Sequence, residues 1–153
     1  MLLPELLTVS HTEQKYDGDC LVACADMALQ YVGRFVPYKR LIRLLRTNIE
    51  YGTPFSNISY LEKLRVTIEQ GNGTIERVIE ILNEGYPIIV LVNTGELPNW
   101  ASDARHAVVV VGIDEVHVWV HDPTFAKAPL KLPFGDFDLA WLAMYERYAV
   151  IRP

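Results

Sequence analysis

The stretch QKYDGDCLVACADMALQY, residues 14–31, joins a polar, turn-prone lead-in to a long apolar segment. The DGD triplet favours a turn, and nearly all residues from Leu21 onward are apolar and compatible with a helix. We therefore expect a helix to begin at or near Cys20, with the carboxylate of Asp19 capping its first free backbone N–H groups. Because this helix is apolar on nearly every side, it should be buried within the domain rather than lie at its edge.

Cys20 would lie in the first turn of that helix, where free N–H groups and the macrodipole favour negative charge. Such positions, particularly beside a histidine, lower the pKa of a cysteine from about 8.5 toward roughly 3.5 to 7.5. A cysteine on an apolar helix can instead be a small hydrophobic core residue, and we interpret Cys24, one turn further in, in that way. Two cysteines four residues apart on one helix are a poor disulfide framework, so both thiols should be reduced.

The composition is typical of a soluble globular protein. The 153 residues are 50% hydrophobic and 22% charged, and we expect a single domain over residues 1–153. A formal net charge of −5 argues against a nucleic-acid or anionic-membrane partner. The N-terminus MLLPELLTVS lacks the basic region of a signal peptide, and no apolar run approaches the ~18 residues of a membrane span. These features predict a cytoplasmic location.

Three more helices are expected between the first helix and residue 86. The segment PYKRLIRLLRTN, which begins at Pro37, predicts an amphipathic helix whose polar face carries Lys39, Arg40, Arg43 and Arg46. We interpret this basic face as solvated, with a site for an acidic partner as the alternative. Further helices should follow Thr53 and Pro54 and span residues 75–84, with a short strand and a GNG turn at 71–73 between them.

The hydrophobic period changes after residue 87, where β-branched runs predict strands. The expected elements are strands at 88–92, 107–113, 116–120, 129–133 and 148–151, and a helix near 137–144 capped by Asp136. The second and third strands, separated by Asp114 and Glu115, should form an antiparallel hairpin. Because most helices precede most strands, we predict an α+β fold with N-terminal helices packed on a C-terminal antiparallel sheet.

His106 opens the run HAVVVVGID, and Asp122 closes the run VHVWVHDP, where Pro123 ends ladder pairing. In a hairpin that turns at residues 114–115, both lie about eight residues from the turn at the same open end, as cross-strand neighbours. A carboxylate that accepts the proton of one imidazole nitrogen leaves the other nitrogen as a base toward a thiol. Together with a cysteine at a helix start, this pair indicates nucleophilic catalysis.

Gln14, the Asp-Cys pair ending at Cys20, the HAVVVVG run from His106 and the HDP motif containing Asp122 resemble the C39-like peptidases of the papain-like cysteine peptidase superfamily. The resemblance extends over nearly the whole chain and implies a papain-like fold. It implies that Cys20 is the nucleophile, His106 the general base and acid, and Asp122 the orienting group. It also implies that Gln14 donates to the oxyanion together with the Cys20 backbone N–H. This chemistry needs no cofactor.

Leu21 and Arg105 stand where glycine is common in that family, and both would crowd the cleft. With Trp100, from the loop of residues 94–103, they are the expected substrate-binding residues. We expect a stand-alone domain, without the transporter membrane and ATPase domains to which the double-glycine leader peptidases of the family are fused.

The sequence thus predicts a cysteine peptidase that hydrolyses a peptide or isopeptide bond of a peptide or protein substrate through a thioester. An acyl or peptidyl transferase on the same triad, and a non-catalytic binding module with an occluded cleft, remain open as alternatives. A metal site is disfavoured, because His117 and His121 would be roughly 13 Å apart along a strand and one ion could not bind both. We expect these two histidines to lie on an exposed or semi-exposed surface. Two cysteines in a C-x3-C spacing are likewise a weak zinc signal.

Overall fold

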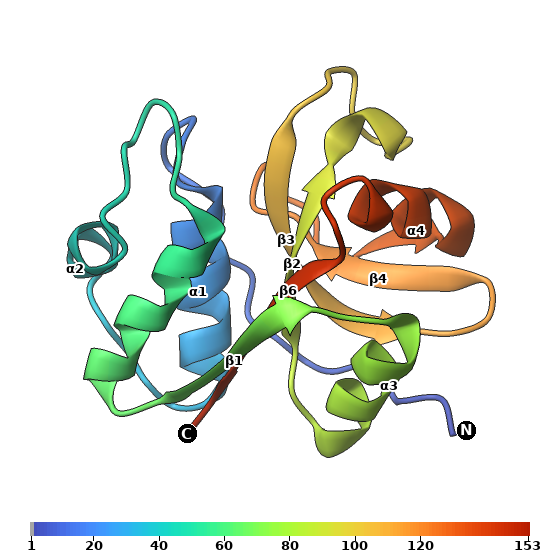
Figure 1. Cartoon of the computed structure of the whole chain (residues 1–153), viewed down its shortest axis with the longest axis horizontal. Helices are drawn as coiled ribbons and strands as arrows, with labels where there is room; N and C mark the ends of the chain where they lie inside the picture. Colours follow the sequence, from blue (N-terminus) through green and yellow to red (C-terminus); the bar gives the residue numbers. More distant parts are fainter. Residues whose placement is uncertain (1) are drawn as a thin grey trace.

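The computed structural model describes residues 2–153, which fold as a six-stranded sheet between two layers of helices (Figure 1). The elements are α1 (Cys20–Tyr31), α2 (Tyr38–Leu44), the 3-10 helix η1 (Phe55–Leu64), β1 (Thr67–Asn72), α3 (Ile75–Glu84), β2 (Ile88–Asn93), the 3-10 helix η2 (Thr94–Glu96), β3 (Arg105–Ile113), β4 (His117–His121), β5 (Leu130–Pro133), α4 (Phe134–Leu142) and β6 (Arg147–Arg152). The strand order is β1-β6-β2-β3-β4-β5, with every pair antiparallel. The predicted α+β class is confirmed. Within the described residues, no helix has the length and apolar character that crossing a bilayer requires.

The sheet is buried on both faces. Along β3, Val109 and Val111 pack in the cluster that contains α1, whereas Val108 and Val110 pack in the cluster that contains α3 and α4. Strands covered on both faces are apolar at every position, which explains the uninterrupted valine run. The N-terminal helices therefore pack on one face of the sheet, as predicted, and α3 and α4 cover the other.

Helix α1 begins at Cys20 as predicted, and residues 21–29 are all buried. One face of the helix packs on the sheet, and residues of α2 and η1 join the same cluster. Its interior carboxylate, Asp26, accepts hydrogen bonds from Thr12 Oγ1 and Gln30 Nε2, each at 2.8 Å. The helix is thus central to the domain, as its composition indicates.

Helix α3 spans Ile75–Glu84 as predicted, with Thr74 Oγ1 accepting a hydrogen bond from the Arg77 backbone N–H at 3.1 Å. Gly85 ends it with a φ of +94°, a conformation that glycine adopts readily. Both ends of this helix are therefore determined by residues adjacent in sequence.

Three predicted boundaries are wrong. Helix α4 begins at Phe134, after Pro133, so Asp136 lies in its first turn and does not cap it. The segment after Pro54 is a 3-10 helix with that proline at its N-cap, and the Thr53 hydroxyl bonds the Thr47 hydroxyl instead. Strand β1 continues into the predicted GNG turn and ends at Asn72, because Gly71 and Asn72 pair with β6.

The N-terminal segment has no regular structure, as expected, but it packs against the sheet through a hydrogen bond from the Leu7 N–H to the Val111 carbonyl at 2.9 Å. The ring of His11 lies edge-on to that of His121, with centroids 5.3 Å apart. His121 is therefore buried, not exposed or semi-exposed as predicted. Burial, with a smaller effect of His11, lowers the pKa of His121 to about 4.

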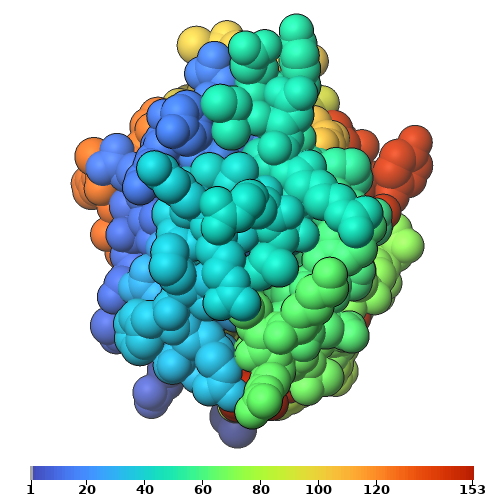
Figure 2. All heavy atoms as spheres, turned by 90° about the vertical axis from the view of Figure 1, so that its left-hand side faces the viewer, coloured from blue at the N-terminus to red at the C-terminus, as the bar shows by residue number. Residues whose placement is uncertain are grey.

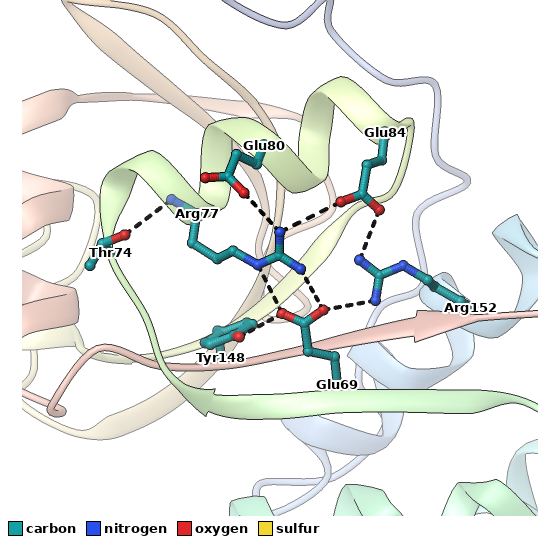
Figure 3. A network of polar contacts seen from close by, with 7 residues as sticks. All are labelled: Glu69, Thr74, Arg77, Glu80, Glu84, Tyr148 and Arg152. Atoms are coloured by element: carbon teal, nitrogen blue, oxygen red, sulfur yellow. Dashed lines mark hydrogen bonds and ion pairs between the residues drawn. The ribbon is translucent and has the colours of Figure 1, made fainter. Parts of the chain in front are cut away.

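An ion-pair network joins α3 to the β1–β6 edge of the sheet (Figure 3). Glu69 on β1 accepts hydrogen bonds from Arg77 Nε at 3.0 Å and Nη2 at 2.7 Å, from the Tyr148 hydroxyl at 2.6 Å and from Arg152 Nη1 at 2.9 Å. Arg152 also pairs with Glu84 at 2.9 Å. The hydrogen bonds from Arg77 are the main reason that the pKa of Glu69 is lowered to about 2, against the opposing effect of burial.

We expect Glu69→Gln to lower the free energy of unfolding at pH 7 by about 1–2 kcal/mol, since it removes a charged acceptor from three donors. Because folding lowers the pKa of Glu69, its stabilisation is present above the ordinary value of 4.5 and is lost as the pH falls toward about 2. Urea unfolding across that range should therefore show the variant and wild type converging in acid.

Glu80→Gln is the matched control, because Glu80 is 55% exposed and, among residues 2–153, pairs with Arg77 alone. Its effect should stay below about 0.5 kcal/mol. Equal losses in the two variants would contradict a central role for Glu69.

Candidate functional site

The start of α1 is fixed by a fully buried carboxylate. Asp19 accepts hydrogen bonds from the backbone N–H groups of Lys15 at 2.8 Å and Tyr16 at 2.9 Å, and from the Tyr38 hydroxyl at 2.7 Å. The predicted capping bond is absent, because this side chain turns toward the preceding loop and not toward the helix. The N–H groups of the first helical turn therefore remain free to act on the side chain of Cys20.

His106 and Asp122 are both buried, and Nε2 of the histidine lies 2.7 Å from Oδ1 of the carboxylate. The two side chains meet, but not through the predicted register. The hairpin turns one residue later than predicted, because Ile113 pairs with Val118 and the Asp114 N–H donates to the His117 carbonyl; beyond a β-bulge at residues 110–112, Val109 pairs with His121. Continued by one residue, this register places Asp122 opposite Val108, so the contact with His106 is diagonal rather than direct.

Two further groups hold the Asp122 carboxylate. Trp100 Nε1 donates to Oδ2 at 2.8 Å, and the Thr124 backbone N–H donates to Oδ1 at 3.0 Å. The Trp100 indole also packs against the imidazole of His106, with centroids 4.8 Å apart. Burial raises the pKa of Asp122, but these hydrogen bonds, led by that of His106, outweigh burial and lower it overall.

Cys20, at the start of α1, is paired electrostatically with His106, near the start of β3. Burial raises the pKa of the thiol, but a hydrogen bond and the positive charge of His106 outweigh burial and lower it, with help from the backbone N–H groups of Ala107 and Leu21. Burial lowers the pKa of His106, yet its bonds to Asp122 and Cys20 raise it to about 9. The arrangement favours a thiolate beside an imidazolium. Since Asp122 engages Nε2, Nδ1 is the ring nitrogen available to the thiol.

Cys24 differs sharply from Cys20. It is fully buried within α1, and burial raises the pKa of its thiol well above the ordinary value. It is a core residue, as its position predicts. Within residues 2–153, no group of three or more His, Cys, Asp and Glu side chains is placed to hold a metal ion.

The amide of Gln14 is oriented by hydrogen bonds at both ends. Its Oε1 accepts from Thr124 Oγ1 at 3.0 Å, while its Nε2 donates to the Tyr16 carbonyl at 2.7 Å and lies 3.4 Å from the Asp17 carbonyl. Its backbone N–H donates to the Pro123 carbonyl at 2.8 Å. The amide oxygen therefore points toward the segment after β4 and the nitrogen toward the loop before α1.

A cavity of about 470 Å³ opens beside the thiol and the imidazole. Six of the seven site residues predicted from the sequence line it: Gln14, Cys20, Leu21, Trp100, Arg105 and His106. The seventh, Asp122, is 1% exposed and contacts the cavity residue His106 without lining the cavity itself. Leu21 and Arg105 form part of the wall and leave the cavity open.

One wall of the cavity was not predicted from the sequence. Residues 51–53 line it, and Arg105 Nη2 holds them by donating to the Thr53 carbonyl at 3.0 Å. The Gly18 N–H donates to the Ile49 carbonyl at 2.8 Å and so joins the same segment to the loop before α1. These contacts are to main-chain carbonyls, which leave no pattern in the sequence.

Gly18→Ala should displace this wall. A Cβ at Gly18 would lie 2.4 Å from the Asn48 carbonyl oxygen and 2.6 Å from the Gly52 nitrogen, and these backbone atoms would have to move. We expect a loss of about 1–3 kcal/mol in the free energy of unfolding, measured in urea. Gly135→Ala is the control, because among the described residues a Cβ there would meet no atom within 4 Å beyond its chain neighbours and its own helix backbone. A Gly18 variant as stable as the Gly135 variant would show that the close approach is not tight.

The Peptidase_C39 like family model matches residues 6–149. The solved structures that share the fold include the following three. A protein described as a C39-like peptidase from Bacillus anthracis has a TM-score of 0.80 and 20% identity, covering 100% of this chain and 98% of the other. A double glycine motif protease from an AMS/PCAT transporter, in complex with its leader peptide, has a TM-score of 0.76 and 19% identity over 100% and 99%. The peptidase domain of Streptococcus ComA, a bifunctional ABC transporter of a quorum sensing pathway, has a TM-score of 0.74 and 18% identity over 94% and 97%.

A search among curated proteins found no match. At these identities the three structures establish the fold alone. Peptidase domains of this kind have the papain-like fold, so the predicted fold is confirmed.

Proposed function

This chain belongs to the Peptidase_C39 like family, and from that premise we propose that it is a cysteine peptidase that cleaves a peptide bond with Cys20, His106 and Asp122. The observation that carries the proposal is the buried 2.7 Å hydrogen bond between His106 and Asp122, beside a thiol whose pKa is lowered. The double glycine motif protease of similar fold was solved with a leader peptide, which supports a peptide as the substrate class here.

In the proposed reaction, the Cys20 thiolate attacks the carbonyl carbon and forms a C–S bond. The His106 imidazolium gives its Nδ1 proton to the departing amine as the C–N bond breaks, which leaves a thioester. Water then attacks the thioester, with His106 now accepting a proton, and releases the carboxylic acid and the thiol. Asp122 accepts the Nε2 hydrogen bond throughout and keeps the ring oriented.

The tetrahedral oxyanion would be bound by Gln14 Nε2 and the Cys20 backbone N–H. Gln14 Nε2 donates to the Tyr16 carbonyl at 2.7 Å and to the Asp17 carbonyl at 3.4 Å, and the longer of these two bonds would be exchanged for one to the substrate. Donors placed in this way typically contribute ~2.7–4 kcal/mol each to the transition state. The open cavity of about 470 Å³ supports catalysis over an occluded binding module.

Alkylation by iodoacetamide, followed by intact mass, tests the thiolate without a known substrate. Because the pKa of Cys20 is lowered, wild type should be labelled near pH 6, where an ordinary thiol of pKa about 8.5 is mostly protonated. His106→Ala should move this reactivity to higher pH, Cys20→Ser should abolish it, and Cys24→Ser should leave it unchanged. If Cys20 reacts only above the ordinary thiol pKa, the catalytic assignment fails.

Digestion of a mixed peptide library should then give cleavage that Cys20→Ser abolishes. Its rate should fall in acid as the thiolate is protonated, and should fall again above about pH 9 as His106 loses the proton it gives to the leaving amine. Added amines that end up joined to the new C-termini would instead identify a transferase. A library that is bound but never cleaved by a protein with a reactive Cys20 would contradict a peptidase.

Thr124→Val tests whether the hydroxyl of Thr124 orients Gln14. Loss of the 3.0 Å bond to Gln14 Oε1 frees the amide to turn, and we expect kcat for library peptides to fall by roughly tenfold. Thr124→Ser should retain the rate. In a Gln14→Ala background the valine substitution should have no further effect, because the group it orients is gone.

Alkylation of Cys20 forms no oxyanion and should be unaffected in the Thr124 variants. An equal loss of kcat with and without Gln14 would mean that Thr124 acts instead through His106, whose Nε2 lies 3.4 Å from its hydroxyl.

A further inference from the structure

The charges of this chain are unevenly distributed along the sequence. Residues 34–65 contain seven of the fourteen Lys and Arg residues but only two of the nineteen Asp and Glu residues. This segment therefore carries a formal charge of +5, and the rest of the chain carries −10. The overall value of −5 conceals a strongly cationic part in an otherwise acidic protein.

Folding brings this segment to one side of the molecule. Figure 2 views that side, where residues from the cyan to the green part of the sequence cover most of the surface. Within it, Arg40, Arg43 and Arg46 from α2 and the turn that follows it, and Lys63 from η1, surround a hollow of about 280 Å³ with Leu44 at its wall. All four cationic residues are exposed. We call these four residues the cationic face.

The cationic face has no carboxylate partners of its own. Among residues 2–153, no Asp or Glu oxygen lies within 4.0 Å of its nitrogen atoms, whereas Arg77 and Arg152 are both paired with glutamates. Arg46 is nevertheless held in place, because it donates to the Tyr60 hydroxyl at 3.0 Å and lies over the Tyr60 ring at 4.2 Å. Part of the face is therefore preorganised while its charge stays uncompensated.

We propose that the cationic face binds a short acidic segment of a partner polypeptide. Arg40 and Arg43 are three residues apart and lie on one side of α2, where two guanidinium groups can each engage a carboxylate with paired hydrogen bonds. Leu44 offers an apolar contact beside them. The small size of the cluster fits a short segment. A nucleic acid or an anionic bilayer would extend past it and meet surface from the part of the chain that carries −10.

Fluorescence anisotropy of a labelled peptide of alternating Glu and Gly tests this proposal, with the Gln and Gly peptide as the neutral probe. Wild type should bind only the acidic probe, and more weakly as salt is added. Arg40→Glu/Arg43→Glu should weaken binding by at least about tenfold, since it reverses two contacting charges. Lys127→Glu/Lys131→Glu changes the net charge equally at exposed sites elsewhere and should bind within about twofold of wild type.

If both double variants bound the acidic peptide equally weakly, net charge alone would explain the binding and the proposal would be overturned. Tighter binding of single-stranded DNA or phosphatidylglycerol vesicles at the same face would overturn it as well. If charge reversal disturbs folding, as judged by circular dichroism, Arg40→Gln/Arg43→Gln against Lys127→Gln/Lys131→Gln provides the same comparison. The readout is independent of peptidase activity.

Discussion

The packing of α1 on the sheet is the constraint on which the rest of the site depends. Residues 21–29 of this helix are buried, and β3, on which it packs, lies within the sheet between β2 and β4. Each buried methylene contributes about 0.8 kcal/mol, so sliding the helix along the sheet would be costly. Cys20 and His106 lie near the starts of these two elements, and their separation is therefore set by the hydrophobic core. Rigid elements of this kind hold reacting groups more precisely than loops do.

Two buried carboxylates then order the loops around the thiol. Asp19 has three donors from the preceding loop and α2, and Asp122 has three from β3 and the two loops beside it. A buried charge without partners would cost several kcal/mol, so the chain segments that supply these donors are held in place. Gln14 joins the two groups of loops, because it bonds Tyr16 on one side and Thr124 on the other.

Local signals in the sequence predict the parts of the fold that local interactions determine. The start of α1, both ends of α3 and the β3–β4 hairpin follow from neighbouring residues, and the positions of Cys20 and His106 at element starts follow with them. What the sequence could not supply depends on distant contacts. Asp19 is claimed by Tyr38 rather than by its own helix, and the wall at residues 51–53 is held by Arg105, which is 52 residues from Thr53. The β3–β4 hairpin turns at residues 115–116 rather than 114–115, and no residue type signals this one-residue difference, so direct pairing of His106 with Asp122 was expected from a register that differs from the observed one.

The position of α2 links the cationic face to the reactive thiol through one rigid element. Arg40 and Arg43 point outward from this helix, while the hydroxyl of its first residue, Tyr38, bonds Asp19 next to Cys20. The ring of Tyr38 is also covered by the Lys15 ammonium at 4.6 Å. Moving α2 would remove a donor from a fully buried carboxylate, which is unfavourable by about 1–3 kcal/mol. An acidic partner on α2 would therefore be held at a fixed distance from the thiol.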